Sequence, residues 1–442
     1  MPIQQPCSTM VEVRNRKNKD KKLSVEHTQK VLPEDDKPKK INKTKIGKLK
    51  EHQTKSSTRY FLAACKCFLI VLIVPPFLNY AALQREASVL QPEGTLYDVG
   101  WGQKLFLSCK GNGAPTVVMD SPTGMNSDVW SLIFDKVAKY SKVCIYDRAG
   151  LGFSDRPHSN TTDVDGTDSK SNIRNKWQPF TAERMVEDLH QLITRSSDQP
   201  QPFLLVGAEL GALIAQFYTR MFESEVMGMI LINPLSDDLF YQDQGIWLHN
   251  WYGHMVPSFQ TVQLGAALGI TRFCLMLGYL QHPMYMSQSI SEDTVKRQKY
   301  LMCHPRHLSS VVDEHHFMNE TFSQFRTVKM MKNIASNISV TVISGNYYDE
   351  QMPGPLNKAW AKSEQNLVTN IYPQSQHIVI NGGDRHLLYQ KPDTIVEPIR
   401  KAVKQWRDKN VTKNSNKSKN SNNSKNSNNS KNSNNDMKSR HS

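Results

Sequence analysis

Large apolar side chains are scarce at both ends of this 442-residue chain. Residues 1–59 are rich in lysine, and the stretch from Asn410 onward repeats units such as Asn-Ser-Asn-Asn-Ser-Lys. Such segments cannot bury enough apolar surface to offset the entropy lost on ordering. We therefore expect 1–59 and 408–442 to be disordered, and a folded body between them at about 95–407.

Acidic residues are also in deficit. Lys and Arg number 55 against 41 Asp and Glu, a formal net charge of +14. Much of the excess lies in the two tails, where it bears on topology and solvation more than on the partner of the folded part. We expect no nucleic acid partner.

Zinc-binding cysteine patterns are missing. The chain has seven cysteines, and no CxxC pair is matched by a second Cys or His pair. One cluster has spacings that match no common ligand set, namely Cys303, His304, His307, His315 and His316. We expect no metal and no cofactor. The body cysteines Cys109, Cys144, Cys274 and Cys303 leave up to two disulfides open.

One apolar run, residues 60–83, is long enough to cross a bilayer. A cleaved signal peptide does not fit, because nearly sixty residues rich in charge precede it, and Pro75-Pro76 should break a buried core helix. We predict a single-pass signal anchor. Lysines crowd its N-terminal side, which predicts a cytoplasmic N-terminus and a lumenal or extracellular body. Glycosylation sequons at Asn160, Asn319, Asn337 and Asn410 suit that side.

The body alternates short β-branched runs with helical patterns, which predicts a mainly parallel sheet covered on both faces. Helices are expected at Phe180–Arg195 and Leu210–Phe222, and a helical insertion, or cap, at about 237–332. We expect the cap's apolar residues to form a core or the wall of a pocket; they are Trp247, Trp251, Phe273, Leu275, Leu277 and Met284. The predicted strands are Thr116–Met119, Lys142–Tyr146, Phe203–Val206, Met229–Ile232, Val340–Ile343 and His377–Ile380.

Three motifs resemble the α/β hydrolases of the esterase and proline-iminopeptidase-like kind. Gly113–Met119 resembles their third strand, Val143–Ser154 contains Asp-Arg-Ala-Gly-x-Gly-x-Ser, and Leu205–Ala212 falls at the nucleophile elbow. The resemblance covers roughly 95–407. It implies an α/β-hydrolase fold with a mainly parallel eight-stranded sheet and a helical cap. Cys109 and Cys144 would then lie on neighbouring strands, which leaves a bridge between them open.

The elbow of that family, G-x-S-x-G, carries the nucleophilic serine. Here Gly207 and Gly211 remain, and Glu209 replaces the serine. A carboxylate that attacked an ester would give an anhydride, so the acyl-enzyme route is closed. The resemblance implies Asp349 as the triad acid and His386 as the histidine. An ungapped count from Pro392 places Arg385 at the histidine position, and a shift of one residue restores His386.

The oxyanion hole of the family would use the backbone N–H groups of Leu210 and of Thr123. Pro122, beside Thr123, stands where relatives commonly have glycine and removes one donor.

These departures favour a homologue that has lost serine-hydrolase chemistry and acts by binding a small apolar ligand or a protein. An alternative is an active hydrolase that uses Glu209 as nucleophile, or a water activated by His386, on a small apolar ester or epoxide. A conventional esterase would need a replacement serine, for which Ser121 is the nearest candidate.

Overall fold

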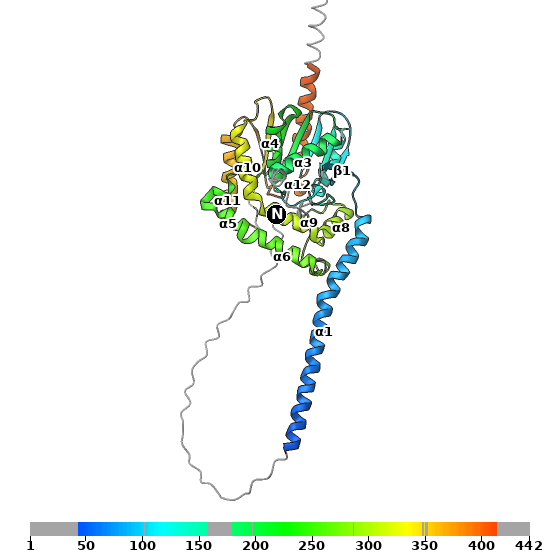
Figure 1. Cartoon of the computed structure of the whole chain (residues 1–442). Helices are drawn as coiled ribbons and strands as arrows, with labels where there is room; N and C mark the ends of the chain where they lie inside the picture. The colour runs from blue at the N-terminus through cyan, green and yellow to red at the C-terminus, as the bar shows by residue number, and fades with distance from the viewer. Residues whose placement is uncertain are drawn as a thin grey trace, which may run out of the picture.

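The computed structural model describes residues 43–412, apart from 101, 158–178, 197, 286, 347–348 and 350–351. For residues 43–58 and 71 it describes the backbone only. A central sheet has helices on both faces, and the long N-terminal helix α1 (Lys43–Val89) extends well beyond the body (Figure 1).

Eight strands form one mixed sheet in the order β1-β2-β4-β3-β5-β6-β7-β8. β1 and β2 form an antiparallel hairpin, β2 also pairs antiparallel with β4, and the remaining neighbours are parallel. The six strands predicted from sequence are all present. The strands are β1 (Thr95–Gly100), β2 (Gln103–Lys110), β3 (Thr116–Asp120), β4 (Lys142–Tyr146), β5 (Phe203–Ala208), β6 (Val226–Ile232), β7 (Ser339–Gly345) and β8 (Gln376–Ile380).

Every residue of β3 and β5 is buried, as expected of central strands covered on both faces. β8 differs, because it lies at the edge of the sheet and Val379 is 48% exposed. One face of the sheet is covered by α3 (Ala182–Arg195), α4 (Leu210–Met221) and α11 (Gly354–Asn366). The other face is covered by η1 (Ser127–Trp130), α2 (Ser131–Ala138), α12 (Leu387–Gln390) and a helix at 393–412.

Between β6 and β7 the chain forms the cap, which contains no strand in its described residues. The short η3 (Glu223–Glu225) lies before β6 and is not part of the cap. The cap elements are η4 (Leu239–Gly245), α5 (Ile246–Asn250), η5 (Trp251–Met255), α6 (Val256–Ala267), α7 (Ile270–Met276), α8 (Glu292–Met302), α9 (Pro305–His316) and α10 (Met318–Met331). A last π-helical turn, η6 (Leu367–Ile371), precedes β8.

Four features differ from the sequence expectations. α1 starts at Lys43, inside the arm predicted to be disordered, where Lys, Glu, Gln and Leu are good helix formers. It also continues through Pro75-Pro76, which we expected to break a helix. Within the cap, Phe273 and Leu277 are exposed by 44% and 71% instead of lying in a core. The final helix reaches Thr412, past the predicted start of the C-terminal tail at 408, of which 413–442 lies outside the described residues.

Candidate active site at the elbow and the cap interface

Glu209 occupies a sharp turn between β5 and α4. Its backbone has φ 49° and ψ −110°, a conformation that non-glycine residues rarely adopt. The two flanking glycines are required by space. A Cβ atom on Gly207 would lie 2.2 Å from the Gly211 carbonyl oxygen, and one on Gly211 would lie 2.4 Å from the Asp120 carbonyl oxygen. The backbone of a nucleophile elbow is therefore intact.

The Glu209 residue is 9% exposed, and its backbone carbonyl accepts N–H groups from Ala212, Leu213 and Leu235. Tyr389, at the end of α12, lies within its electrostatic reach. Burial raises the pKa of the Tyr389 hydroxyl above its usual value, and the Glu209 carboxylate raises it further. Segments nearly two hundred residues apart thus meet beside the elbow.

The predicted acid, Asp349, and the predicted histidine, His386, are each paired with a different residue and not with each other. Asp349 lies with an oxygen 3.5 Å from Arg385 Nε; the Asp349 side chain is buried, and that of Arg385 is 10% exposed. His386 Nδ1 lies 3.3 Å from Asp384 Oδ1, which also accepts the backbone N–H of His386 at 2.6 Å. The geometry therefore follows the ungapped count from Pro392, in which Arg385 faces the acid.

The two predicted oxyanion-hole residues are both buried, Leu210 at the start of α4 and Thr123 in the loop after β3. The Thr123 hydroxyl has no hydrogen-bond partner among the described residues. The next N–H along the loop, that of Gly124, donates to Glu314 of the cap at 2.8 Å. Ser121 is held inside the same loop, where its hydroxyl donates to the Asn126 carbonyl, so it is not presented to a substrate.

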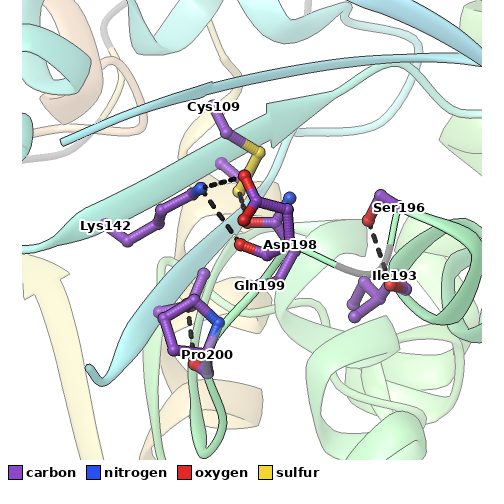
Figure 2. Close-up of a disulfide and its surroundings, with 9 residues drawn as sticks. Cys109, Lys142, Ile193, Ser196, Asp198, Gln199 and Pro200 are labelled. Carbon is purple, nitrogen blue, oxygen red and sulfur yellow. Dashed lines mark hydrogen bonds and ion pairs between the residues drawn. A yellow bond between two sulfur atoms is a disulfide. The ribbon is translucent and has the colours of Figure 1, made fainter. Parts of the chain in front are cut away.

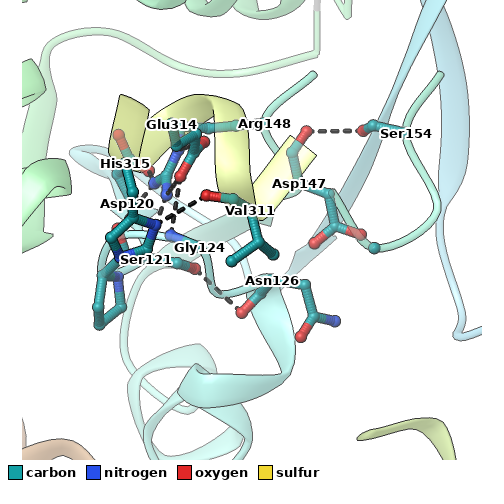
Figure 3. A network of polar contacts seen from close by, with 12 residues as sticks. Asp120, Ser121, Gly124, Asn126, Asp147, Arg148, Ser154, Val311, Glu314 and His315 are labelled. Atoms are coloured by element: carbon teal, nitrogen blue, oxygen red, sulfur yellow. Dashed lines mark hydrogen bonds and ion pairs between the residues drawn. The ribbon is translucent and has the colours of Figure 1, made fainter. Parts of the chain in front are cut away.

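Arg148 is the centre of a buried polar network that joins this loop to the cap (Figure 3). Its guanidinium donates to Asp120 Oδ1 at 2.6 Å and to both oxygens of Glu314 at 2.8 and 2.9 Å. It also donates to the carbonyls of Ser121 and Pro122. One side chain therefore holds the end of β3, the loop after it and α9 in fixed relation.

The charges of this network are held by mutual pairing. Burial opposes the charge on Arg148, but Glu314 and Asp120 outweigh it and raise the Arg148 pKa. Burial raises the Asp120 pKa against the influence of Arg148. Neighbouring Asp147 accepts the backbone N–H groups of Ser127 and Phe153, while burial raises its pKa to about 6.

Sequence reasoning noted Asp147 and Arg148 only as part of a family motif and missed Glu314. A charged residue facing the apolar side of α9 was the available signal, but its partner lies 166 positions away. No local pattern identifies such a pair.

Three histidines of the cap have hydrogen-bond partners within the described residues. His304 Nδ1 accepts the His307 N–H at the start of α9, and His307 Nδ1 accepts the Gly152 N–H at 3.0 Å. His315 packs its ring against Phe259 and pairs Nδ1 with the Val311 carbonyl, while burial lowers its pKa to about 3. Its Nε2 has no hydrogen-bond partner within the described part of the chain. The described part of the chain holds no group of three or more His, Cys, Asp or Glu placed to bind a metal ion.

Cys109 and Cys144 form a disulfide between the paired strands β2 and β4 (Figure 2). Beside it, Lys142 reaches across to Asp198, with Nζ 3.1 Å from the carboxylate. Cys274 and Cys303 are free thiols. The sequence left this bridge open, and the directly opposed register of the two cysteines accounts for it.

Known proteins resemble this chain in sequence and in fold. The family described as alpha/beta hydrolase fold matches residues 104–269. Two uncharacterised proteins of Bacillus subtilis (strain 168), YbdG and YqjL, are 22% and 24% identical over 175 and 129 residues. Those matches cover 39% and 29% of this chain, but only 47% and 43% of the relatives, about half their length.

Solved structures agree with the match. The Cif epoxide hydrolase from Acinetobacter nosocomialis has a TM-score of 0.53 at 12% identity, over 74% of this chain and 96% of its own. Cfl2 from Burkholderia cenocepacia has a TM-score of 0.50 at 15% identity, over 70% of this chain and 95% of its own. The chain has the α/β-hydrolase fold. At these identities the likeness establishes the fold, and function has to be argued from the site.

Proposed function

We propose that this protein is a membrane-anchored member of the α/β-hydrolase fold that lacks serine-hydrolase chemistry and acts by binding. The observation that carries the proposal is the pairing of Asp349 with Arg385 beside an elbow that presents Glu209. A serine hydrolase needs a hydroxyl nucleophile and a base that accepts its proton. Glu209 has no hydroxyl, and a guanidinium has no acceptor site for a proton.

Two unpaired polar atoms support a ligand site between body and cap. A Cβ on Gly124 would lie 3.1 Å from the His315 ring, so His315 borders the loop that carries Thr123. The Thr123 hydroxyl and His315 Nε2 are both buried and unpartnered among the described residues. Buried polar groups normally have partners, so these two atoms suit the polar group of an otherwise apolar small ligand.

A second candidate is a hydrolase with a carboxylate nucleophile. The intact elbow favours it, and one structural neighbour is named an epoxide hydrolase. In this route a Glu209 oxygen attacks an epoxide carbon, the ring C–O bond breaks, and the alkoxide formed takes a proton from water. A second water, assisted by the His386–Asp384 pair, hydrolyses the resulting ester, which releases a diol and restores the Glu209 carboxylate. Glutamate is one methylene longer than aspartate, and misplacement of about 1 Å costs on the order of a hundredfold in rate.

Turnover by the full chain on ester and epoxide panels, beside Glu209→Gln, separates the two candidates. We expect no turnover above the Glu209→Gln background. Turnover that disappears in Glu209→Gln would replace the binding proposal with the carboxylate route. The double variant Glu209→Ser/Arg385→His, compared with Glu209→Ser alone, tests whether a nucleophile and a base suffice to restore ester hydrolysis on this backbone.

We also propose a cytoplasmic N-terminus and a lumenal or extracellular body. Among the described residues, one helix, Arg59–Val89, is long and apolar enough to cross a membrane. The Cys109–Cys144 disulfide supports an oxidising compartment for the body. Asn319 and Asn337 are exposed on its surface, Asn410 lies in the final helix, and Asn160 is outside the described residues.

Glycosidase digestion of the full chain from eukaryotic cells tests this topology. We expect faster gel migration after digestion, and a smaller shift for Asn337→Gln and Asn319→Gln. Migration that digestion leaves unchanged would contradict a lumenal body.

A further inference from the structure

The cap docks on α1 partway along its apolar stretch. The turn at Gly269, between α6 and α7, lies against the helix so closely that a Cβ there would be 2.3 Å from the Pro75 carbonyl oxygen. Asn79 is 4% exposed and donates to the carbonyls of Ala266 and Cys303 at 3.0 and 3.1 Å. In Figure 1 the far end of α6 meets α1 well inside the length of that helix.

An ion pair marks the upper end of this contact. Arg272, on α7, donates to Asn79 Oδ1 and forms a two-pronged pair with Glu86 at 2.8 and 2.9 Å. Between Gly269 and Arg272, the cap therefore contacts α1 from the level of Pro75 to that of Glu86.

Those levels place α7 at the bilayer surface if α1 is the proposed anchor. Twenty helical residues span about 30 Å, the thickness of a hydrocarbon core, so a core that begins at Tyr60 ends near Tyr80. Gly269, opposite Pro75, then lies within the outer part of that core. Arg272 and Glu86 lie near the headgroups, where their charges are solvated.

The outward face of α7 fits such a position. Ile270, Phe273 and Leu277 recur at helical spacing and are exposed by 49%, 44% and 71%, with Met276 beside them at 76%. The opposite face, with buried Thr271 and paired Arg272, is turned toward the protein. A continuous apolar stripe on a soluble surface would be unfavourable, and the leaflet that α1 crosses would cover it.

A pocket of about 430 Å³ opens where α1 ends beside α7 and α8. Apolar side chains, among them Leu90, Leu275 and Tyr300, line its depth. Arg85 and Lys299 also line it and are exposed. Lys296 lines it too but pairs with Glu292 at 2.9 Å, and Arg272 and Glu86 cancel each other's charge. Arg85 and Lys299 thus place positive charge beside an apolar hollow at the predicted level of the headgroups.

We propose that this pocket binds an anionic phospholipid of the leaflet in which α7 rests. The phosphate would sit between Arg85 and Lys299, and an acyl chain would lie along the apolar lining. This inference rests on the proposed anchor topology, which glycosidase digestion tests independently.

The depth of α7 is tested on the full chain in nanodiscs that contain brominated lipid, which quenches tryptophan on contact. We expect Phe273→Trp to add fluorescence that brominated lipid quenches. Met221→Trp, on α4 and similarly exposed at 54%, should add fluorescence that it leaves unchanged. Equal behaviour of the two variants would overturn the placement of α7.

Headgroup selectivity is tested by native mass spectrometry of the full chain released from nanodiscs of equal phosphatidylglycerol and phosphatidylcholine. We expect retained phosphatidylglycerol in excess, and a loss of about tenfold in Arg85→Glu/Lys299→Glu. The matched control, Lys401→Glu/Lys404→Glu, reverses two exposed charges on the final helix and should retain the lipid.

Equal retention of both lipids, or an equal loss in the control, would overturn the pocket assignment. So would displacement of phosphatidylglycerol by millimolar inorganic phosphate, which would identify a free anion as the ligand. A glycosidase shift that persists in any of these cases would leave the topology standing while the lipid site falls.

Discussion

The Arg148 network and the Glu209 elbow lie at the same edge of the sheet and differ in what has been kept. Around Arg148 the guanidinium has carboxylate or carbonyl partners on every side. Around Glu209 the sharp turn between β5 and α4 is intact, but its side chain has no hydroxyl, and Asp349, the predicted acid, faces Arg385.

The difference separates folding requirements from chemical ones. A buried charge must be paired wherever the fold places it, or the fold loses several kcal/mol. The turn at position 209 is held differently, because Gly207 and Gly211 set its backbone and keep it with Glu209 in place. The proposed loss of chemistry therefore has not relaxed the geometry of the turn, and the intact turn by itself is no evidence of activity.

Removal of Arg148 should have the largest effect. Arg148→Met leaves Asp120 and Glu314 buried without a cation, so we expect a loss of about 3–5 kcal/mol in the free energy of unfolding. Chemical unfolding of the full chain in detergent measures it. The control is Arg156→Met, whose partner Asp313 is partly exposed and whose loss should cost about 1 kcal/mol or less. Equal losses would remove the distinction drawn for the network.

Gly211 tests the elbow backbone. In Gly211→Ala the new Cβ meets the Asp120 carbonyl oxygen at 2.4 Å, an atom that cannot rotate away, so we expect a loss of about 3 kcal/mol. Gly253→Ala is the matched control, because its Cβ would meet nothing nearer than 3.9 Å. That change should stabilise the helix by up to about 1 kcal/mol. Tolerance of Gly211→Ala in thermal unfolding would show that the elbow is not tightly held.

Arg385 should matter less to stability than Arg148. Its contact with Asp349 is a single one at 3.5 Å, against the several shorter bonds of Arg148. We expect Arg385→Met to cost about 1–2 kcal/mol in chemical unfolding, chiefly because Asp349 is left without its cation. A loss as large as that of Arg148→Met would make the Arg385 pair part of the structural framework and weaken the comparison.

The fold was predictable because its signals are local. Each of the six predicted strands is a short apolar run, and the motif from Asp147 to Ser154 together with Gly207 and Gly211 has a fixed spacing. The hairpin of β1 and β2 was not picked out, because its strands carry mixed polarity and lie where the sheet is covered less completely.

The site was predictable only in part. The position of Glu209 in the turn can be predicted from one motif, but the choice between Arg385 and His386 depends on the conformation of a loop. The exposure of Phe273 and Leu277 depends on where α1 docks, which is set by Pro75, Asn79 and other residues far away in the chain. Composition alone assigned these two apolar residues to a core or to the wall of a pocket.

The smallest expected effect is a gain in the free energy of unfolding, whereas the preceding substitutions of arginine and of Gly211 should each lower it. Glu209 holds φ 49° at a cost of about 1 kcal/mol, which glycine would not incur. Glu209→Gly should therefore raise the unfolding free energy by up to about 1 kcal/mol, whereas Glu209→Ala keeps a Cβ and should not. Thermal unfolding of both variants beside the parent distinguishes strain relief from removal of the carboxylate. If alanine stabilises as much as glycine, the buried charge and not the backbone is the source of strain, and the elbow would store no conformational energy for any chemistry.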